Sequence, residues 1–186
     1  FNAPSSPGAY YYQGSVENGR AGFFVANTYD LKARHKWSME ALTLHEAVPG
    51  HHLQIAIAQE FGDMPEFLKN EGYTSFVEGW ALYAESLGEK MGFYEDPYSN
   101  YGKLTYEMWR ALRLVVDTGL HYKGWARDQA LKYFTDNLAK SPLEIQVEVD
   151  RYIVWPGQAL AYKMGQLKIL ELREKSQKTL GDKFDI

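Results

Sequence analysis

The 186-residue sequence contains no cysteine. This absence excludes disulfide bonds, thiolate nucleophiles, iron–sulfur clusters and cysteine-ligated zinc fingers. Apolar runs of about eighteen residues are also absent, so we expect no membrane-spanning segment. The net charge is only −4, which gives no electrostatic reason to expect binding to nucleic acid. Hydrophobic residues make up 45% of the chain, enough for a sizeable core, so the sequence indicates a folded domain.

The chain begins at Phe1 rather than methionine, and no signal or targeting segment can be read in it. We therefore expect a fragment of a longer protein, or a mature form that has lost its N-terminal part. The composition fits the cytoplasm and the periplasm equally, and it indicates no particular oligomeric state.

Residues 1–30 differ in composition from the rest of the chain. Prolines and glycines surround two aromatic runs, at residues 10–12 and 23–25, and a turn-like stretch at residues 16–20 lies between them. Aromatic and β-branched residues separated by a turn predict a β-hairpin or a pair of strands.

From residue 38 onward the apolar residues follow helical spacing. Ser38 is a candidate N-cap, and the same spacing continues through residues 72–88 and 104–120. Residues 141–144 have the layout of a capping box with proline at the first helical position, which marks another helix start. Residues 158–175 predict a long final helix. The expected fold class is therefore mainly α with a small β element.

The most informative feature of the sequence is a cluster of histidines. Three of the five histidines, His45, His51 and His52, fall within eight residues, and Glu46 follows the first of them. A neutral imidazole is the commonest protein metal ligand, and a glutamate beside the first histidine is the arrangement found in zinc hydrolases. In those enzymes the carboxylate takes a proton from water while the metal stabilises the developing oxyanion. The cluster thus predicts a metal site with Glu46 as general base.

The usual spacing of such sites, His-Glu-x-x-His, is interrupted here by Pro49. Proline lacks a backbone N–H and crowds the preceding turn, and Gly50 permits unusual dihedral angles, so we expect the helix to break here. A two-residue bulge would return His51 to the position of the usual second ligand. In an unbroken helix His52 would lie about 10.5 Å from His45 along the axis, too far to share one ion. We favour His51 over His52 as second ligand, and a purely structural cluster is the alternative.

A tetrahedral catalytic zinc ion needs three protein ligands and leaves one position for water. Glu78 is the leading candidate for the third ligand, because it lies on a predicted helix in largely apolar company. Glu85 lies two turns later on roughly the same face, where it can support the site from behind. The alternative is that Glu78 caps a helix or pairs with an arginine.

Four motifs together resemble the DUF885 family, a bacterial family of uncharacterised function placed with the zincin-like metallopeptidases. The resemblance covers nearly the whole chain, and the motifs occur in the expected order. Because the family is longer than this chain, the resemblance implies that an N-terminal, mostly helical half is absent here. The motifs are HEAVPGHHLQ (45–54), EGWALYAE (78–85), RALRLVVDTGLH (110–121) and WPGQALAYK (155–163).

The chain is also loosely similar to helical gluzincin carboxypeptidases and to dipeptidases of the angiotensin-converting-enzyme type. This resemblance implies zinc held by His45, His51 and Glu78, with Glu46 as catalytic base. Those enzymes carry a tyrosine near the C-terminal end that donates to the tetrahedral intermediate, and Tyr152 is the residue that matches it here. The inserted residues before the second histidine depart from the gluzincin pattern.

Several polar residues are candidates for substrate binding. Arg113 and His121 share a predicted helical face, where arginine suits bidentate contact with a carboxylate, and a solvated charged face is the alternative. Arg151 is also a candidate for substrate binding, and a solvated charged face is again the alternative. If His52 is not a metal ligand, we expect it to bind substrate as well. Tyr162 either points into the cleft or packs in the core.

The sequence thus predicts one catalytic region over residues 1–186, with a β-hairpin segment at 1–30 and a helical metal-site bundle at 38–186. In zincin folds an edge strand beside the metal binds extended substrate, a role expected for residues 9–28 unless the hairpin is only structural. The expected function is a zinc-dependent hydrolase, a carboxypeptidase-like or dipeptidase-like enzyme acting on a peptide or small amide. The alternatives are hydrolysis of a non-peptide amide or ester, and a non-catalytic module with a structural or degenerate metal site.

Overall fold

A computed structural model of the chain describes residues 4, 6–63, 65–70 and 72–185. It is mainly helical, with 68% helix and one small two-stranded antiparallel sheet, which confirms the expected fold class. The strands are β1 (Ala9–Tyr12) and β2 (Phe23–Ala26), and the helices are α1 (Met39–Glu46), α2 (His51–Glu60), α3 (Glu66–Asn70), α4 (Thr74–Leu87), α5 (Pro97–His121), α6 (Arg127–Asn137), α7 (Pro142–Val154) and α8 (Ala161–Leu180).

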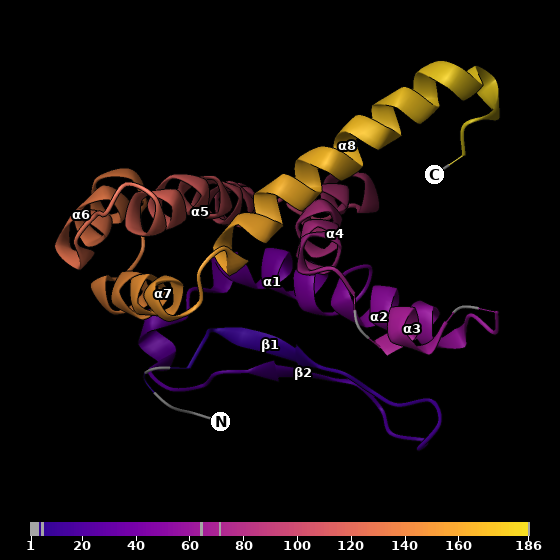
Figure 1. Cartoon of the computed structure of the whole chain (residues 1–186), viewed down its shortest axis with the longest axis horizontal. Coiled ribbons are helices and arrows are strands. Elements are labelled where there is room, and N and C mark those ends of the chain that lie inside the picture. Colours follow the sequence, from indigo (N-terminus) through magenta and orange to yellow (C-terminus); the bar gives the residue numbers. More distant parts are fainter. Residues whose placement is uncertain (1–3, 5, 64, 71, 186) are drawn as a thin grey trace.

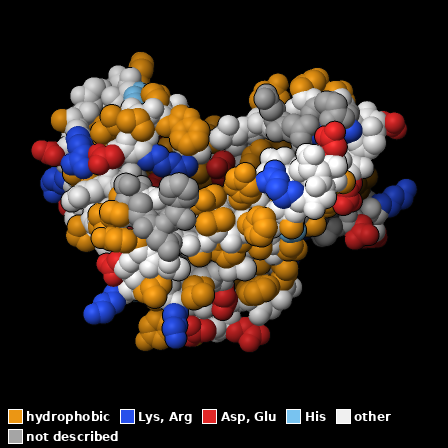
Figure 2. Space-filling model, turned by 90° about the horizontal axis from the view of Figure 1, so that it is seen from below, with side chains coloured by type: hydrophobic (Ala, Val, Ile, Leu, Met, Phe, Trp, Pro, Cys, Tyr) orange, Lys and Arg blue, Asp and Glu red, His pale blue; other side chains and the backbone are white. Residues whose placement is uncertain are grey.

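The predicted hairpin is present, and residues 1–3 and 5 of its segment lie outside the described residues. β1 pairs with β2 in a register that places Tyr10 opposite Val25, and the hairpin forms a layer beneath the helices (Figure 1). Seen from that side, the molecule carries many hydrophobic side chains on its surface (Figure 2). Exposed residues of the hairpin segment include Tyr12, Val16 and Phe23.

The helix that carries the first histidine breaks where the sequence predicts. α1 ends at Glu46, a turn follows, and α2 begins at His51. A Cβ atom at Gly50 would lie 1.9 Å from the carbonyl oxygen of His45, so only glycine fits this close approach. The carbonyl oxygen of Pro49 accepts a hydrogen bond of 2.7 Å from the indole N–H of Trp80, which ties the turn to α4.

Two glycines allow α4 and α8 to cross in close contact. A Cβ atom at Gly165 would lie 1.8 Å from the carbonyl oxygen of Ser75, and one at Gly79 would lie 2.5 Å from the backbone of Gly165. The crossing places the first turns of both helices beside each other, while the far end of α8 extends away from the body (Figure 1). Glu78 consequently lies close to the N-terminal end of α8, although the two are far apart in the sequence.

The helices α5, α6 and α7 pack around the larger hydrophobic core. The predicted capping box at the start of α7 is confirmed, because Ser141 and Glu144 exchange side-chain hydrogen bonds with each other's backbone N–H. α5 begins earlier than expected, since Asp96 caps it and Pro97 opens it. Ser38 precedes α1 as predicted, but its hydroxyl donates to a carbonyl oxygen instead of capping the helix. The core consists of Leu112, Val116, Ala130, Phe134, Leu138, Ile145, Val149, Tyr152 and Ala159.

None of the helices in the described part of the chain combines the length and the apolar character needed to cross a bilayer. This agrees with the lack of long apolar runs in the sequence.

Candidate metal centre

Three predicted ligands meet at the junction of α1, α2 and α4. The Oε2 atom of Glu78 lies 3.5 Å from Nε2 of His45 and 3.3 Å from Nε2 of His51. Both histidines are buried, and one potential ligand atom from each of the three residues lies within 4.8 Å of the other two. The break at residues 47–50 therefore does what the sequence predicts, because it returns His51 to the side of His45.

The spacing of the three atoms suits a zinc ion. Bonds of 2.0–2.2 Å in a tetrahedral site place neighbouring ligand atoms roughly 3.3 Å apart, close to both separations from the Glu78 oxygen. The other oxygen of Glu78, Oε1, accepts a hydrogen bond of 3.4 Å from the side-chain amide of Gln158. Two imidazoles and one carboxylate form the donor set that zinc hydrolases use, so the residues fit this metal.

The first histidine is held from behind by a buried carboxylate, as the spacing of Glu85 predicts. Nδ1 of His45 lies 2.7 Å from Oε1 of Glu85, and this same oxygen lies 3.2 Å from Nη2 of Arg110. All three side chains are almost inaccessible to solvent. A carboxylate behind a histidine fixes the ring orientation and raises the basicity of the ligand nitrogen. Arg110 in turn fixes the carboxylate, a role that sequence reasoning did not assign to it.

The electrostatics of the cluster favour a cation. Burial opposes the charged form of His45, but hydrogen bonds to Glu78 and Glu85 outweigh it and raise the pKa of the imidazole to about 9. Burial likewise opposes the charged form of Glu78, yet hydrogen bonds from His45 and His51 hold the pKa of its carboxyl well below the usual value. The site therefore stabilises positive charge next to a carboxylate, as a metal site must.

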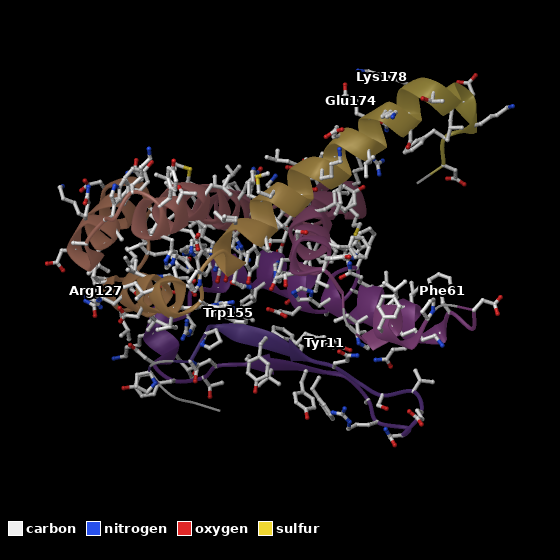
Figure 3. The ribbon with its side chains drawn as sticks, viewed as in Figure 1. Tyr11, Phe61, Arg127, Trp155, Glu174 and Lys178 are labelled. Carbon is white, nitrogen blue, oxygen red and sulfur yellow. The ribbon has the colours of Figure 1, made fainter. Side chains whose placement is uncertain are left out.

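The histidine that follows does not join the cluster. The Nδ1 atom of His52 lies 3.0 Å from the hydroxyl of Tyr11, and the two rings meet edge to face with centroids 5.5 Å apart. Tyr11 extends from β1 toward α2 (Figure 3). His52 thus ties the hairpin to α2, and the structure gives it no position in the wall of the cavity beside the metal cluster.

Glu46, the expected general base, lies in the wall of a cavity of about 390 Å³ together with His45. The residue is 6% exposed, and within the described ranges no hydrogen bond or ion pair engages its carboxylate. A buried carboxylate that faces a cavity and makes no such contact is free to accept a proton there.

The expected oxyanion donor, Tyr152, lies in the core instead of the cavity wall. Its hydroxyl donates to Glu148 at 2.8 Å and accepts from Arg113 Nε at 2.7 Å and Trp109 Nε1 at 3.0 Å. A hydroxyl has one proton and two lone pairs, so the hydrogen-bonding capacity of Tyr152 is exhausted. This corrects the role that the resemblance implied, since a core side chain with no proton to give cannot donate to a substrate.

Tyr162 lines the cavity instead. Its ring stacks on that of His45 with centroids 6.2 Å apart, and its oxygen accepts hydrogen bonds from Arg151 and Gln158 at 3.2 and 3.1 Å. Both printed bonds use lone pairs of Tyr162, so its O–H proton is left for a third partner. The signal in the sequence was the four-residue spacing between Gln158 and Tyr162, which places Gln158 in a short 3-10 turn just before α8 and Tyr162 in the first turn of α8.

The candidate substrate-binding residues divide into two groups. Arg113 and Arg151 lie in the cavity wall, Arg113 almost completely buried and Arg151 half-buried. His121 lies at the exposed end of α5, where Nε2 contacts the carbonyl oxygen of Tyr152 at 2.9 Å. The shared helical face predicted for Arg113 and His121 therefore does not bring His121 to the cavity, because the two turns between them carry it past the cavity rim.

Comparison with known proteins identifies relatives of the whole chain. The family described as bacterial proteins of unknown function (DUF885) matches residues 1–186. A solved structure named a "putative lipoprotein" from Colwellia psychrerythraea is similar, with a TM-score of 0.94 and 45% identity, and the match covers 97% of this chain and 31% of that one. Another, named a "putative lipoprotein of unknown function" from Shewanella oneidensis, has a TM-score of 0.81 at 23% identity, over 97% of this chain and 35% of that one.

The chain thus spans about a third of the length of these two solved relatives. No curated protein matches it. At 23% identity, the similarity to the Shewanella structure shows a shared fold alone. The family match extends over every residue of the sequence. The chain therefore belongs to the DUF885 family of bacterial proteins.

Proposed function

We propose that this region is the catalytic part of a zinc-dependent hydrolase that cleaves peptide bonds. The observation that carries the proposal is the convergence of His45, His51 and Glu78, with the Glu78 oxygen 3.5 and 3.3 Å from the two imidazole nitrogens. Glu46 is buried in the cavity wall beside His45 and pairs with no described residue, which supports a hydrolytic function over a purely structural metal site.

The residues of the chain have distinct tasks in this proposal. Zinc, when bound by the three ligands, supplies Lewis-acid polarisation of a carbonyl group and lowers the pKa of water. Glu46 accepts the proton of the attacking water and delivers it to the leaving amine. Tyr162 donates its O–H proton to the oxygen on which negative charge develops, with Arg151 and Gln158 holding its oxygen in place.

The experiment that tests the proposal compares the full-length protein with its Glu46→Gln variant. The variant should keep its zinc, because Glu46 is not a ligand. Its rate of peptide hydrolysis should fall by roughly 10²- to 10⁴-fold, the contribution of general acid–base catalysis. Glu144→Gln, a change at another cavity carboxylate, serves as control and should keep most of the activity. A Glu46→Gln variant with undiminished turnover would refute the mechanism.

We also propose that the natural protein resides in the bacterial cell envelope, outside the cytoplasm. The support is that both solved relatives are named "putative lipoprotein". Fractionation of the native host with an antibody against this region tests the location. Recovery in the membrane or periplasmic fraction is expected, and recovery with the cytosol would contradict it.

A further inference from the structure

The cavity beside the metal cluster is built mainly from the hairpin segment, α1, α5 and α7. Its volume of about 390 Å³ is in the range of sites that enclose small ligands. His45 and Glu46 form part of its wall, and Arg113 and Arg151 form another part. A ligand that fills the cavity therefore meets the reacting groups and the two guanidinium groups together.

Arg113 is the most deeply buried cation of this wall, with 2% of the residue exposed. Its Nε donates to Tyr152 and its Nη2 to Glu148, at 2.7 and 2.9 Å. Its Nη1 is buried and has no hydrogen-bond partner among the described residues. Two of the three nitrogen atoms are thus fixed by the core, and the third is a donor that a ligand in the cavity can satisfy.

Around Arg113 and Arg151 the cavity wall carries more cations than carboxylates, although Asp30 and Glu46 lie elsewhere in the same wall. Glu148 is shared between Arg113 at 2.9 Å and Arg151 at 4.0 Å. Glu144 is likewise shared between Lys140 at 3.1 Å and Arg34 at 3.6 Å.

Each of these two carboxylates therefore faces two cations. An anionic ligand group would restore the balance, and guanidinium groups bind carboxylates with two parallel hydrogen bonds.

The distance from the metal cluster limits where that anionic group can lie on a substrate. The ring of Tyr162 stands between the two sites, with its centroid 6.2 Å from the ring of His45 and 4.2 Å from Cζ of Arg113. An extended peptide advances about 3.3–3.6 Å per residue. The two separations together amount to at most about 10 Å, so a chain whose scissile carbonyl lies at the metal cluster reaches Arg113 with a carboxylate within about three residues.

We propose that Arg113 and Arg151 form a carboxylate subsite, and that the substrates are peptides whose free C-terminus lies within about three residues of the scissile bond. This inference rests on the proposed hydrolytic function and names its substrate class. The protein is then an exopeptidase that recognises the C-terminal carboxylate. Water adds to the carbonyl carbon, the C–N bond breaks, and the released amine carries the proton delivered by Glu46.

The test uses full-length protein loaded with zinc and three peptides of otherwise identical sequence. One ends in a free carboxylate, one ends in an amide, and one ends in an amide with glutamate as the last residue. The free acid should be cleaved roughly 10- to 100-fold better than both amides, as measured by kcat/KM, since charged hydrogen bonds are lost from the amides. Product analysis by mass spectrometry shows how many residues are removed.

The variants Arg113→Gln and Arg151→Gln should each reduce the preference for the acid to within about threefold, measured as the ratio of kcat/KM for the acid and the amide on the same variant. Arg127→Gln is the matched control, because Arg127 pairs with Asp150 at the edge of the molecule (Figure 3), does not line the cavity, and should keep the full preference. If the Arg113→Gln variant fails to fold, the Arg151→Gln variant still tests the carboxylate subsite, because Arg151 is only half-buried.

A binding measurement on zinc-free protein separates this inference from the hydrolytic function. Isothermal titration with N-acetyl-leucine should show binding roughly tenfold or more tighter than with N-acetyl-leucine amide, and Arg151→Gln should abolish the difference. If no peptide is cleaved but this difference is found, the hydrolase proposal fails and the carboxylate subsite stands. Equal binding of acid and amide, or equal cleavage of the free acid and the glutamate amide, would overturn the carboxylate subsite.

Discussion

Nδ1 of His45 lies 2.7 Å from Oε1 of Glu85, and both side chains are buried. A carboxylate can only accept, so Nδ1 carries a ring proton, and Nε2 is the nitrogen left to bind a metal. Nε2 faces Glu78, whose oxygen lies 3.5 Å away, and a metal bound there would replace the proton that Nε2 shares with this oxygen. One contact therefore fixes both the tautomer and the orientation that a metal-binding histidine requires.

Replacing Glu85 by glutamine should weaken zinc binding about 10- to 100-fold, because the amide holds the imidazole less firmly and lowers the basicity of Nε2. The dissociation constant can be measured by competition with a chelator. Glu89→Gln is the matched control, since Glu89 is exposed on the following turn and pairs with Lys103. Equal zinc affinity in Glu85→Gln and Glu89→Gln would show that the contact has no part in metal binding.

The two tyrosines near the site should respond differently to removal of the hydroxyl. Tyr162→Phe should lower kcat by roughly 10²-fold or more, as loss of an oxyanion donor does, and should lower Tm less than Tyr152→Phe does, because the oxygen of Tyr162 accepts two longer hydrogen bonds. Tyr152→Phe should instead lower the free energy of unfolding by about 1–3 kcal/mol, because Arg113, Trp109 and Glu148 lose a buried partner. Steady-state kinetics and thermal denaturation of both variants test this. The reverse pattern would return the catalytic role to Tyr152.

Glu148 should make the fold sensitive to acid. Burial opposes its charged form, but Arg113 and Arg151 outweigh burial and lower the pKa of the carboxyl below its usual 4.5. A group whose pKa is depressed in the folded protein contributes stability above its unfolded pKa and loses it as the pH falls through the folded pKa. The contribution of Glu148 is therefore complete above about pH 4.5 and declines at lower pH.

The Glu148→Gln variant should accordingly unfold about 6–12 °C below the wild type at pH 7, equivalent to about 3 kcal/mol for a broken buried pair in a chain of this size. The gap in Tm should narrow as the pH falls from 4.5 toward 3. Metal-free protein is used for both, so that the ligands titrate equally. Glu174→Gln, which removes an exposed partner of Lys178 on the outer part of α8 (Figure 3), should change Tm little at any pH. A difference in Tm that stays constant or widens in acid would contradict the lowered pKa of Glu148.

Local patterns were enough to predict most of the elements and the metal cluster. The capping box at Ser141 was readable because its hydrogen bonds span only three residues. The break before His51 was readable because proline and glycine act on the backbone that immediately surrounds them. The position of His51 relative to His45 followed from that break alone.

Contacts between segments that lie far apart in the chain could not be predicted from the sequence. Tyr152 matched a family pattern, yet its hydroxyl is used by Arg113 and Trp109, which lie about forty residues away. Tyr162 reaches the metal cluster only because two glycines let α8 cross α4 closely. Such packing depends on which helix faces meet, and helical periodicity shows only that each helix has an apolar face.

The zinc content of three purified full-length proteins tests the central claim most directly. The wild type and a His52→Gln variant should each retain about one zinc ion per chain, because His52 contacts Tyr11 and not the metal cluster. A His51→Gln variant should retain less than about 0.2, because it lacks one of the three ligands. Full zinc content in His51→Gln, or its loss in His52→Gln, would contradict the site described for this protein.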